Sequence, residues 1–160
     1  MLDLNYPAEY GTDIHEGYFK VISDQEIEGY ADTRVAGDYI LHYNIKFNKP
    51  FKTFNGWKDE SVLVQVSLSL VDQQGCKNNY EAELKPYGWD FDAVHQAAKQ
   101  EWNTLLSKIE VEGDEADKKK FYTNLYRAYA KQTWSDADGR YRDPLENIQQ
   151  TQNKQPMYGG

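Results

Sequence analysis

Apolar and polar residues alternate with a period of two along much of the first half of the chain. The run from Tyr39 to Phe47 places an aromatic or aliphatic residue at every second position, and the run from Val62 to Leu70 places Val or Leu there. Such alternation is typical of β-strands that bury one face. We therefore expect two half-buried strands, each with its apolar side turned inward. Shorter candidate strands cover residues 18–22, 26–30 and 51–54.

Turn signals separate these candidate strands. Asn55 and Gly56 both tolerate positive φ, and Pro50 cannot donate a hydrogen bond to a strand partner. The pattern predicts an antiparallel sheet over residues 14–84, as one part of a β-sandwich.

The period becomes helical after Pro86. Asp90 is a suitable N-cap, and apolar residues then recur every three or four positions as far as Ile109. Gly113 ends this pattern, and a second helix follows with two adjoining aromatic stripes. The sequence predicts helices over residues 91–108 and 117–132, with strands alone before about Leu84.

Composition excludes several classes of function. The chain has 160 residues, of which 39% are hydrophobic and 14% aromatic, so it can form a packed core. Its formal net charge of -8 disfavours nucleic acid and anionic lipid as partners. No apolar run suggests a membrane span, and the first residues lack a signal-peptide pattern. Cys76 is the single cysteine, which leaves no intrachain disulfide to consider.

An acidic turn follows the second predicted helix. Asp136, Asp138 and Gly139 resemble part of an EF-hand loop, but Trp134 and Leu145 occupy positions where that loop needs carboxylates, so the EF-hand is excluded. Local capping by the two aspartates is the favoured interpretation. A second interpretation is a sugar contact, because an indole face packs on a pyranose while carboxylates accept its hydroxyls. The three histidines have no spacing that predicts a metal or catalytic site.

Several segments together resemble the glycoside hydrolase family 92 α-mannosidases. They are GTDIHEGYF at 11–19, EIEGY at 26–30, WDFDAVHQAAKQEWN at 89–103, LSKIEVEG at 106–113, FYTNLYR at 121–127 and SDADGRY at 135–141. The resemblance implies an α+β fold, in which part of an antiparallel β-sandwich precedes helices that begin an (α/α)6 barrel. Residues 1–86 would then be part of the N-terminal β-sandwich domain, 87–113 a linker helix, and 114–160 the start of the helical-barrel catalytic domain.

The resemblance also implies a chemistry. Family members hydrolyse terminal α-linked mannose from glycans, with calcium and with inversion, and this chain resembles an α-1,2-type enzyme that is secreted or periplasmic. The acid Glu, the base Asp and the calcium ligands belong to later barrel segments, so we expect no catalytic or metal-binding residue here and an inactive fragment that needs the remainder of the catalytic domain. Trp134 and Asp136 are expected at the rim of the substrate pocket. The alternative is a non-catalytic β-rich module that binds carbohydrate or protein.

Overall fold

The computed structural model describes residues 14–34, 38–51, 61–130 and 133–156. The chain divides into two compact units. The sheet unit consists of Met1–Pro86 and Trp134–Met157, and the helical unit consists of Tyr87–Thr133 and Tyr158–Gly160. The fold is α+β, with an antiparallel sheet followed by helices, as the sequence predicted.

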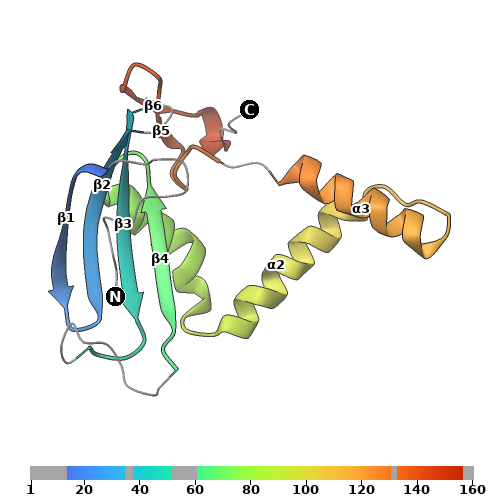
Figure 1. The fold of residues 1–160 in the computed structure, drawn as a ribbon, viewed down its shortest axis with the longest axis horizontal. Coiled ribbons are helices and arrows are strands. Elements are labelled where there is room, and N and C mark those ends of the chain that lie inside the picture. Colours follow the sequence, from blue (N-terminus) through green and yellow to red (C-terminus); the bar gives the residue numbers. More distant parts are fainter. Residues whose placement is uncertain (1–13, 35–37, 52–60, 131–132, 157–160) are drawn as a thin grey trace. The chain divides into compact units, whose positions relative to one another are not determined.

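The sheet is a four-stranded antiparallel meander in the order β1-β2-β3-β4 (Figure 1). Its strands are β1 (Ile14–Ser23), β2 (Glu26–Arg34), β3 (Asp38–Phe47) and β4 (Val64–Ser69). The alternating run at 39–47 is thus confirmed as a strand. Candidates 18–22 and 26–30 fall within β1 and β2, whereas candidate 51–54 and the Asn55–Gly56 turn lie outside the described residues except for Phe51.

One face of the sheet carries the apolar side chains. Ile27, Tyr43 and Ile45 form its buried cluster, against which Phe47 and Phe51 pack. Tyr43 pairs with Leu68 and Ile45 with Val66, so these β4 residues share that face. In antiparallel pairs, directly opposed side chains lie on the same side of the sheet.

The expected burial of the apolar face of β4 is wrong for this structure. Val64, Val66 and Leu68 are exposed, at 48–49% of their maximal area, while Ser67 and Ser69 on the opposite face are buried. A helix lies on the polar face of β4 and accounts for the burial of the two serines. Alternation correctly identifies a strand, but it does not show which face other elements cover.

A helical segment follows β4 where the sequence predicted only strand, which corrects that expectation. It comprises α1 (Gln73–Asn79), the π-helix η1 (Tyr80–Leu84) and the 3₁₀-helix η2 (Lys85–Tyr87). Asp72 caps α1 by accepting a hydrogen bond from the Gly75 backbone at 2.7 Å. A cap of this kind satisfies backbone donors at a helix start. The segment lacks an apolar period, so its sequence did not indicate a helix.

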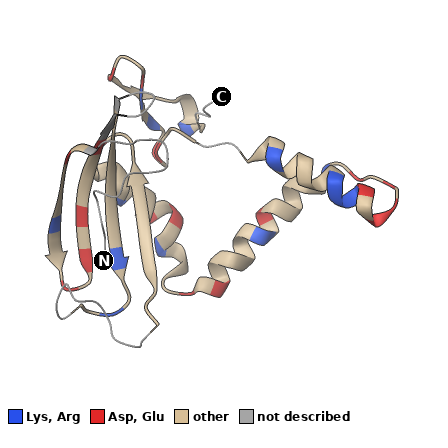
Figure 2. Cartoon of the chain, in the orientation of Figure 1, with Lys and Arg blue, Asp and Glu red and all other residues tan. Residues whose placement is uncertain are grey.

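Polar contacts hold this helical segment on the sheet. Asn79 donates to the Leu68 carbonyl at 2.7 Å, and Gln73 donates to the Tyr43 carbonyl at 3.0 Å. Acidic residues lie along β2 between basic residues of β1 and β3 (Figure 2), and Lys77 of α1 pairs with Glu28 of β2 at 3.5 Å. The helix therefore covers the polar face of the sheet.

The helical unit contains the two predicted helices, α2 (Phe91–Leu106) and α3 (Glu115–Tyr129). Asp90 and Asp114 cap them through hydrogen bonds at 2.9 Å and 2.8 Å. The rings of Trp102 and Tyr126 lie 4.4 Å apart and join the two helices. None of the helices in the described part of the chain has the length and apolarity needed to cross a bilayer.

A small hairpin completes the sheet unit. It consists of β5 (Arg140–Arg142) and β6 (Ile148–Gln150), and the 3₁₀-helix η3 (Gln152–Lys154) follows it. From Gln149 onward, Gln, Asn, Lys and Pro without an apolar period predict loop, and this expectation is wrong for the last two residues of β6. The assignment of residues 114–160 to the barrel domain stays a prediction.

Candidate functional site

The acidic turn of the sequence is a tight loop closed by its own backbone. The Asp136 amide donates to the Arg140 carbonyl at 2.8 Å, and the Gly139 amide donates to the Asp136 carbonyl at 2.8 Å. Gly139 has a φ of 88°, in the left-handed region that glycine adopts without strain. Asp138 caps the turn by accepting from the Arg140 amide at 3.0 Å. The predicted capping role of this aspartate is therefore present.

Asp136 points into the protein. It is 6% exposed, and its two carboxylate oxygens accept hydrogen bonds from the Ser69 hydroxyl at 2.8 Å and the Asn79 amide at 2.9 Å. Asn79 also accepts from the Ala137 backbone at 2.6 Å, so one side chain contacts the turn twice. Burial raises the pKa of Asp136, although these hydrogen bonds oppose the rise.

Arg140 bridges the turn and α1. Its Nη1 and Nη2 atoms donate to the Asp72 carboxylate at 2.8 Å and 3.2 Å, and its Nε atom donates to Asp138 Oδ2 at 2.8 Å. The hydrogen bond from Arg140 lowers the pKa of Asp72. Burial opposes ionisation of Asp138, but hydrogen bonds from Arg140 and Asn78 still lower its pKa. Both carboxylates are thus stabilised in their charged form.

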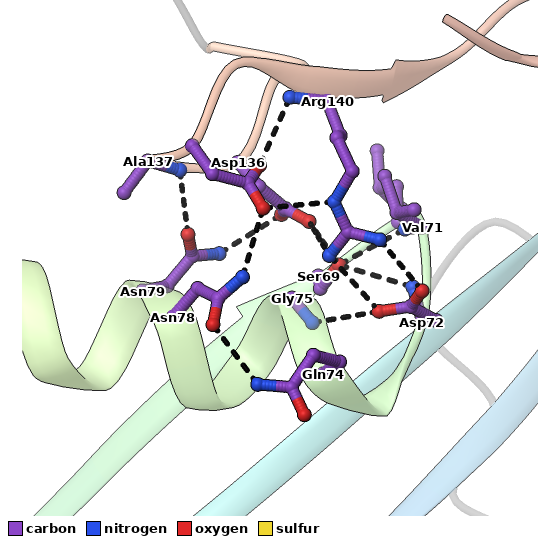
Figure 3. A network of polar contacts seen from close by, with 12 residues as sticks. Ser69, Val71, Asp72, Gln74, Gly75, Asn78, Asn79, Asp136, Ala137 and Arg140 are labelled. Atoms are coloured by element: carbon purple, nitrogen blue, oxygen red, sulfur yellow. Dashed lines mark hydrogen bonds and ion pairs between the residues drawn. The ribbon is translucent and has the colours of Figure 1, made fainter. Parts of the chain in front are cut away.

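These residues form one connected set, which we call the Arg140 network (Figure 3). Its members are Ser69, Asp72, Asn78, Asn79, Asp136, Asp138 and Arg140. It joins the end of β4 and the start of α1 to the acidic turn. The carboxylates are satisfied by donors from the protein itself.

The Arg140 network does not fit a calcium ion. Calcium sites need several oxygen ligands that face one point without a competing cation. Here the guanidinium of Arg140 lies at that position, 2.8 Å from Asp72 and 4.0 Å from Asp136. Within the ranges that the structure describes, no cluster of three His, Cys, Asp or Glu side chains could hold a metal ion.

The two predicted pocket-rim residues lie in different environments. Trp134 is 45% exposed, whereas Asp136, two residues later, is buried in the Arg140 network. An exposed indole is accessible to a ligand, and the satisfied carboxylate of Asp136 positions the turn. Contact of either residue with a sugar stays a prediction. Sequence reasoning missed Ser69, Asp72 and Asn79 because nothing in their spacing connects them to a turn 57 to 68 residues later.

Comparison with known proteins decides the family. The model of the glycosyl hydrolase family 92 catalytic domain matches residues 75–159, which is more than half of the chain. The chain belongs to glycosyl hydrolase family 92. The match begins within α1 and includes the whole acidic turn, so the resemblance noted in the sequence is confirmed.

Solved family 92 structures share the fold. The α-mannosidase BT3965 from Bacteroides thetaiotaomicron superposes with a TM-score of 0.78 at 20% identity, and the match covers 92% of this chain. Its complex with mannoimidazole gives a TM-score of 0.79, also at 20% identity, over 92% of this chain and 24% of that one. The inverting mannosidase BT2199 from the same organism gives 0.73 at 14% identity, over 94% of this chain. The chain spans about a quarter, 24% and 26%, of the lengths of BT3965 and BT2199. A search of curated proteins gave no match.

Proposed function

We propose that the polypeptide to which this chain belongs hydrolyses terminal α-linked mannose from glycans, with inversion and with preference for the α-1,2 linkage. The match of the family 92 catalytic-domain model to residues 75–159 carries this proposal. The fold shared with an α-mannosidase that binds mannoimidazole supports mannose as the sugar. We also propose that the enzyme is periplasmic or secreted.

An inverting glycosidase needs two carboxyl groups. One protonates the leaving oxygen, and the other activates water on the opposite face of the sugar, about 6.5–9.5 Å away. On our proposal both groups come from parts of the polypeptide outside this chain. None of the carboxylates of the Arg140 network suits either role, because protein donors already occupy Asp72, Asp136 and Asp138.

The role that we propose for this chain is to form part of the pocket rim. The half-exposed indole of Trp134 can pack on the apolar face of a mannose ring, as aromatic side chains commonly do in sugar sites. Asp136, also proposed at this rim, contributes by fixing the adjoining turn. Calcium dependence is part of the proposal, with ligands outside this chain, since the carboxylates described here do not fit the ion.

The proposal is tested with the full-length polypeptide encoded by the gene. Purified enzyme is assayed on α-1,2-, α-1,3- and α-1,6-mannobiose, with calcium or after treatment with a chelator. We expect fastest release of mannose from the α-1,2 substrate and loss of activity on chelation. Residues 1–160 alone serve as the comparison and should release none.

Each part of this experiment can contradict a different part of the proposal. No hydrolysis of any mannobiose by the calcium-loaded polypeptide would overturn the enzymatic proposal and favour a non-catalytic module. Full activity after treatment with the chelator would contradict the proposed dependence on calcium. Hydrolysis by residues 1–160 would place the catalytic groups within this chain.

A further inference from the structure

The acidic turn is attached to the sheet unit mainly through polar contacts. Its links to β4 and α1 connect residues 57 to 68 positions apart in sequence. No residue of the turn or hairpin belongs to the buried apolar cluster of the described residues, which consists of Ile27, Tyr43 and Ile45. Hydrogen bonds and ion pairs therefore determine where the turn lies.

Arg140 is the central member of this attachment. Its guanidinium contacts Asp72 at the start of α1 and Asp138 within the turn at the same time. Because the guanidinium is planar and its donors have fixed directions, the two contacts set the orientation of the turn as well as its distance from α1. An ammonium group is a point charge without this fork, so lysine cannot reproduce both contacts.

Removal of Arg140 would also leave a repulsive set of charges. The carboxylates of Asp72, Asp136 and Asp138 all lie within 4.0 Å of the guanidinium, which supplies the positive charge that all three face. Carboxylates close together without a cation disfavour one another's ionised form. The turn would then move away from α1 or take up protons.

Trp134 lies at the start of the segment that this attachment fixes. It is the first residue of the C-terminal part of the sheet unit and precedes Asp136 by two positions. We propose that Arg140 is a positioning residue, which sets the place of the Trp134 indole in the substrate pocket by holding the turn on Asp72. This inference rests on the proposed mannosidase function.

The test is a double-mutant cycle in the full-length enzyme, with Arg140→Lys, Trp134→Ala and both together. Loss of a well-placed aromatic contact is worth a factor of about three to ten, so we expect Arg140→Lys to raise KM by that factor and to leave kcat within about twofold. The double variant should have the KM of Trp134→Ala alone, because a misplaced indole and a missing one are equivalent. Multiplicative effects of the two changes, or an unchanged KM in Arg140→Lys, would overturn the proposal.

A matched control separates positioning from stability. Ile27→Val lies in the apolar cluster, away from the turn, and should lower thermal stability without any change in KM. If Arg140→Lys does not fold, Asp72→Asn replaces it, because this variant keeps the side-chain shape and weakens the bidentate contact. Its KM should rise in the same direction. A KM change in Ile27→Val equal to that in the network variants would refute the positioning role.

Fluorescence decides the question without reference to activity. The difference between each protein and its Trp134→Phe counterpart isolates the emission of Trp134, which acrylamide quenches in proportion to its exposure. Arg140→Lys should change this quenching, and Ile27→Val should not. Identical quenching of Trp134 in the wild type and in Arg140→Lys would overturn the inference. Failure of the wild type to hydrolyse mannosides would instead refute the proposed function.

Discussion

Gly75 provides the sharpest test of how tightly the acidic turn packs on α1. A Cβ atom at this buried position would lie 2.1 Å from Asp136 Oδ2 and 2.3 Å from Ser69 Oγ. Both atoms belong to short, buried side chains that hydrogen bond to each other at 2.8 Å. Gly75→Ala should therefore push these side chains apart and break their bond.

We expect Gly75→Ala to lower the stability of the protein, whereas a change from glycine to alanine within a helix usually raises it. Replacing glycine by alanine inside a helix ordinarily stabilises by roughly 0.5–1 kcal/mol. Overpacking costs about 1–3 kcal/mol, and loss of a hydrogen bond to a charged group costs about 1.5–3 kcal/mol. We expect a net destabilisation of about 2–5 kcal/mol, which lowers Tm by about 4–20 °C in a protein of this size.

Thermal unfolding of Gly75→Ala, followed by circular dichroism, measures this effect. Gln74→Ala is the matched control, because it changes the adjacent, exposed residue of the same helix and should stay within about 0.5 kcal/mol of the wild type. In a Ser69→Ala background the cost of Gly75→Ala should fall, since one of the clashing atoms is absent. A Gly75→Ala protein as stable as the wild type, or more stable, would refute the packing described here.

Three further predictions follow from the same structure. The folded-state pKa of Asp72 is lowered, so its ion pair stabilises the fold above the unfolded-state pKa of 3.8, and this stability is lost as pH falls through the folded-state pKa. The stability advantage of the wild type over Asp72→Asn should therefore vanish at strongly acidic pH. A stability difference that persists at that pH would contradict this prediction. Burial raises the pKa of Cys76 to about 12, so a thiol reagent at pH 8 should modify it only after denaturation, and stoichiometric modification of the native protein would contradict its inert character. Residues 1–160 alone should self-associate in sedimentation experiments through the exposed β4 face of Val64, Val66 and Leu68, and a stable monomer would contradict that expectation.

The sequence predicted those elements whose own residues carry a clear period. β3 alternates along nearly its whole length, and α2 and α3 have aspartate caps followed by apolar residues at helical spacing. Each of these signals is local, because backbone geometry alone places such residues on one face. The structure confirms all three elements.

The segment after β4 could not be predicted in the same way. α1 contains Gly75, two glutamines and two asparagines, so it has neither an apolar period nor strong helix formers throughout. Its stability comes from the Asp72 cap and from contacts with the polar face of the sheet. The contact between Asp72 and Arg140 spans 68 residues, and no local pattern indicates such a pair. Tertiary contacts decided this part of the fold.

The anomer released first tests the central claim most directly. The full-length polypeptide is mixed with an α-mannoside in an NMR tube, and the anomeric proton signals of free mannose are followed before mutarotation equalises them. An inverting α-mannosidase must release β-mannose first, because water attacks the face opposite the leaving group. Initial appearance of β-mannose is the result that our account predicts. Initial appearance of α-mannose, or the absence of free mannose, would contradict it.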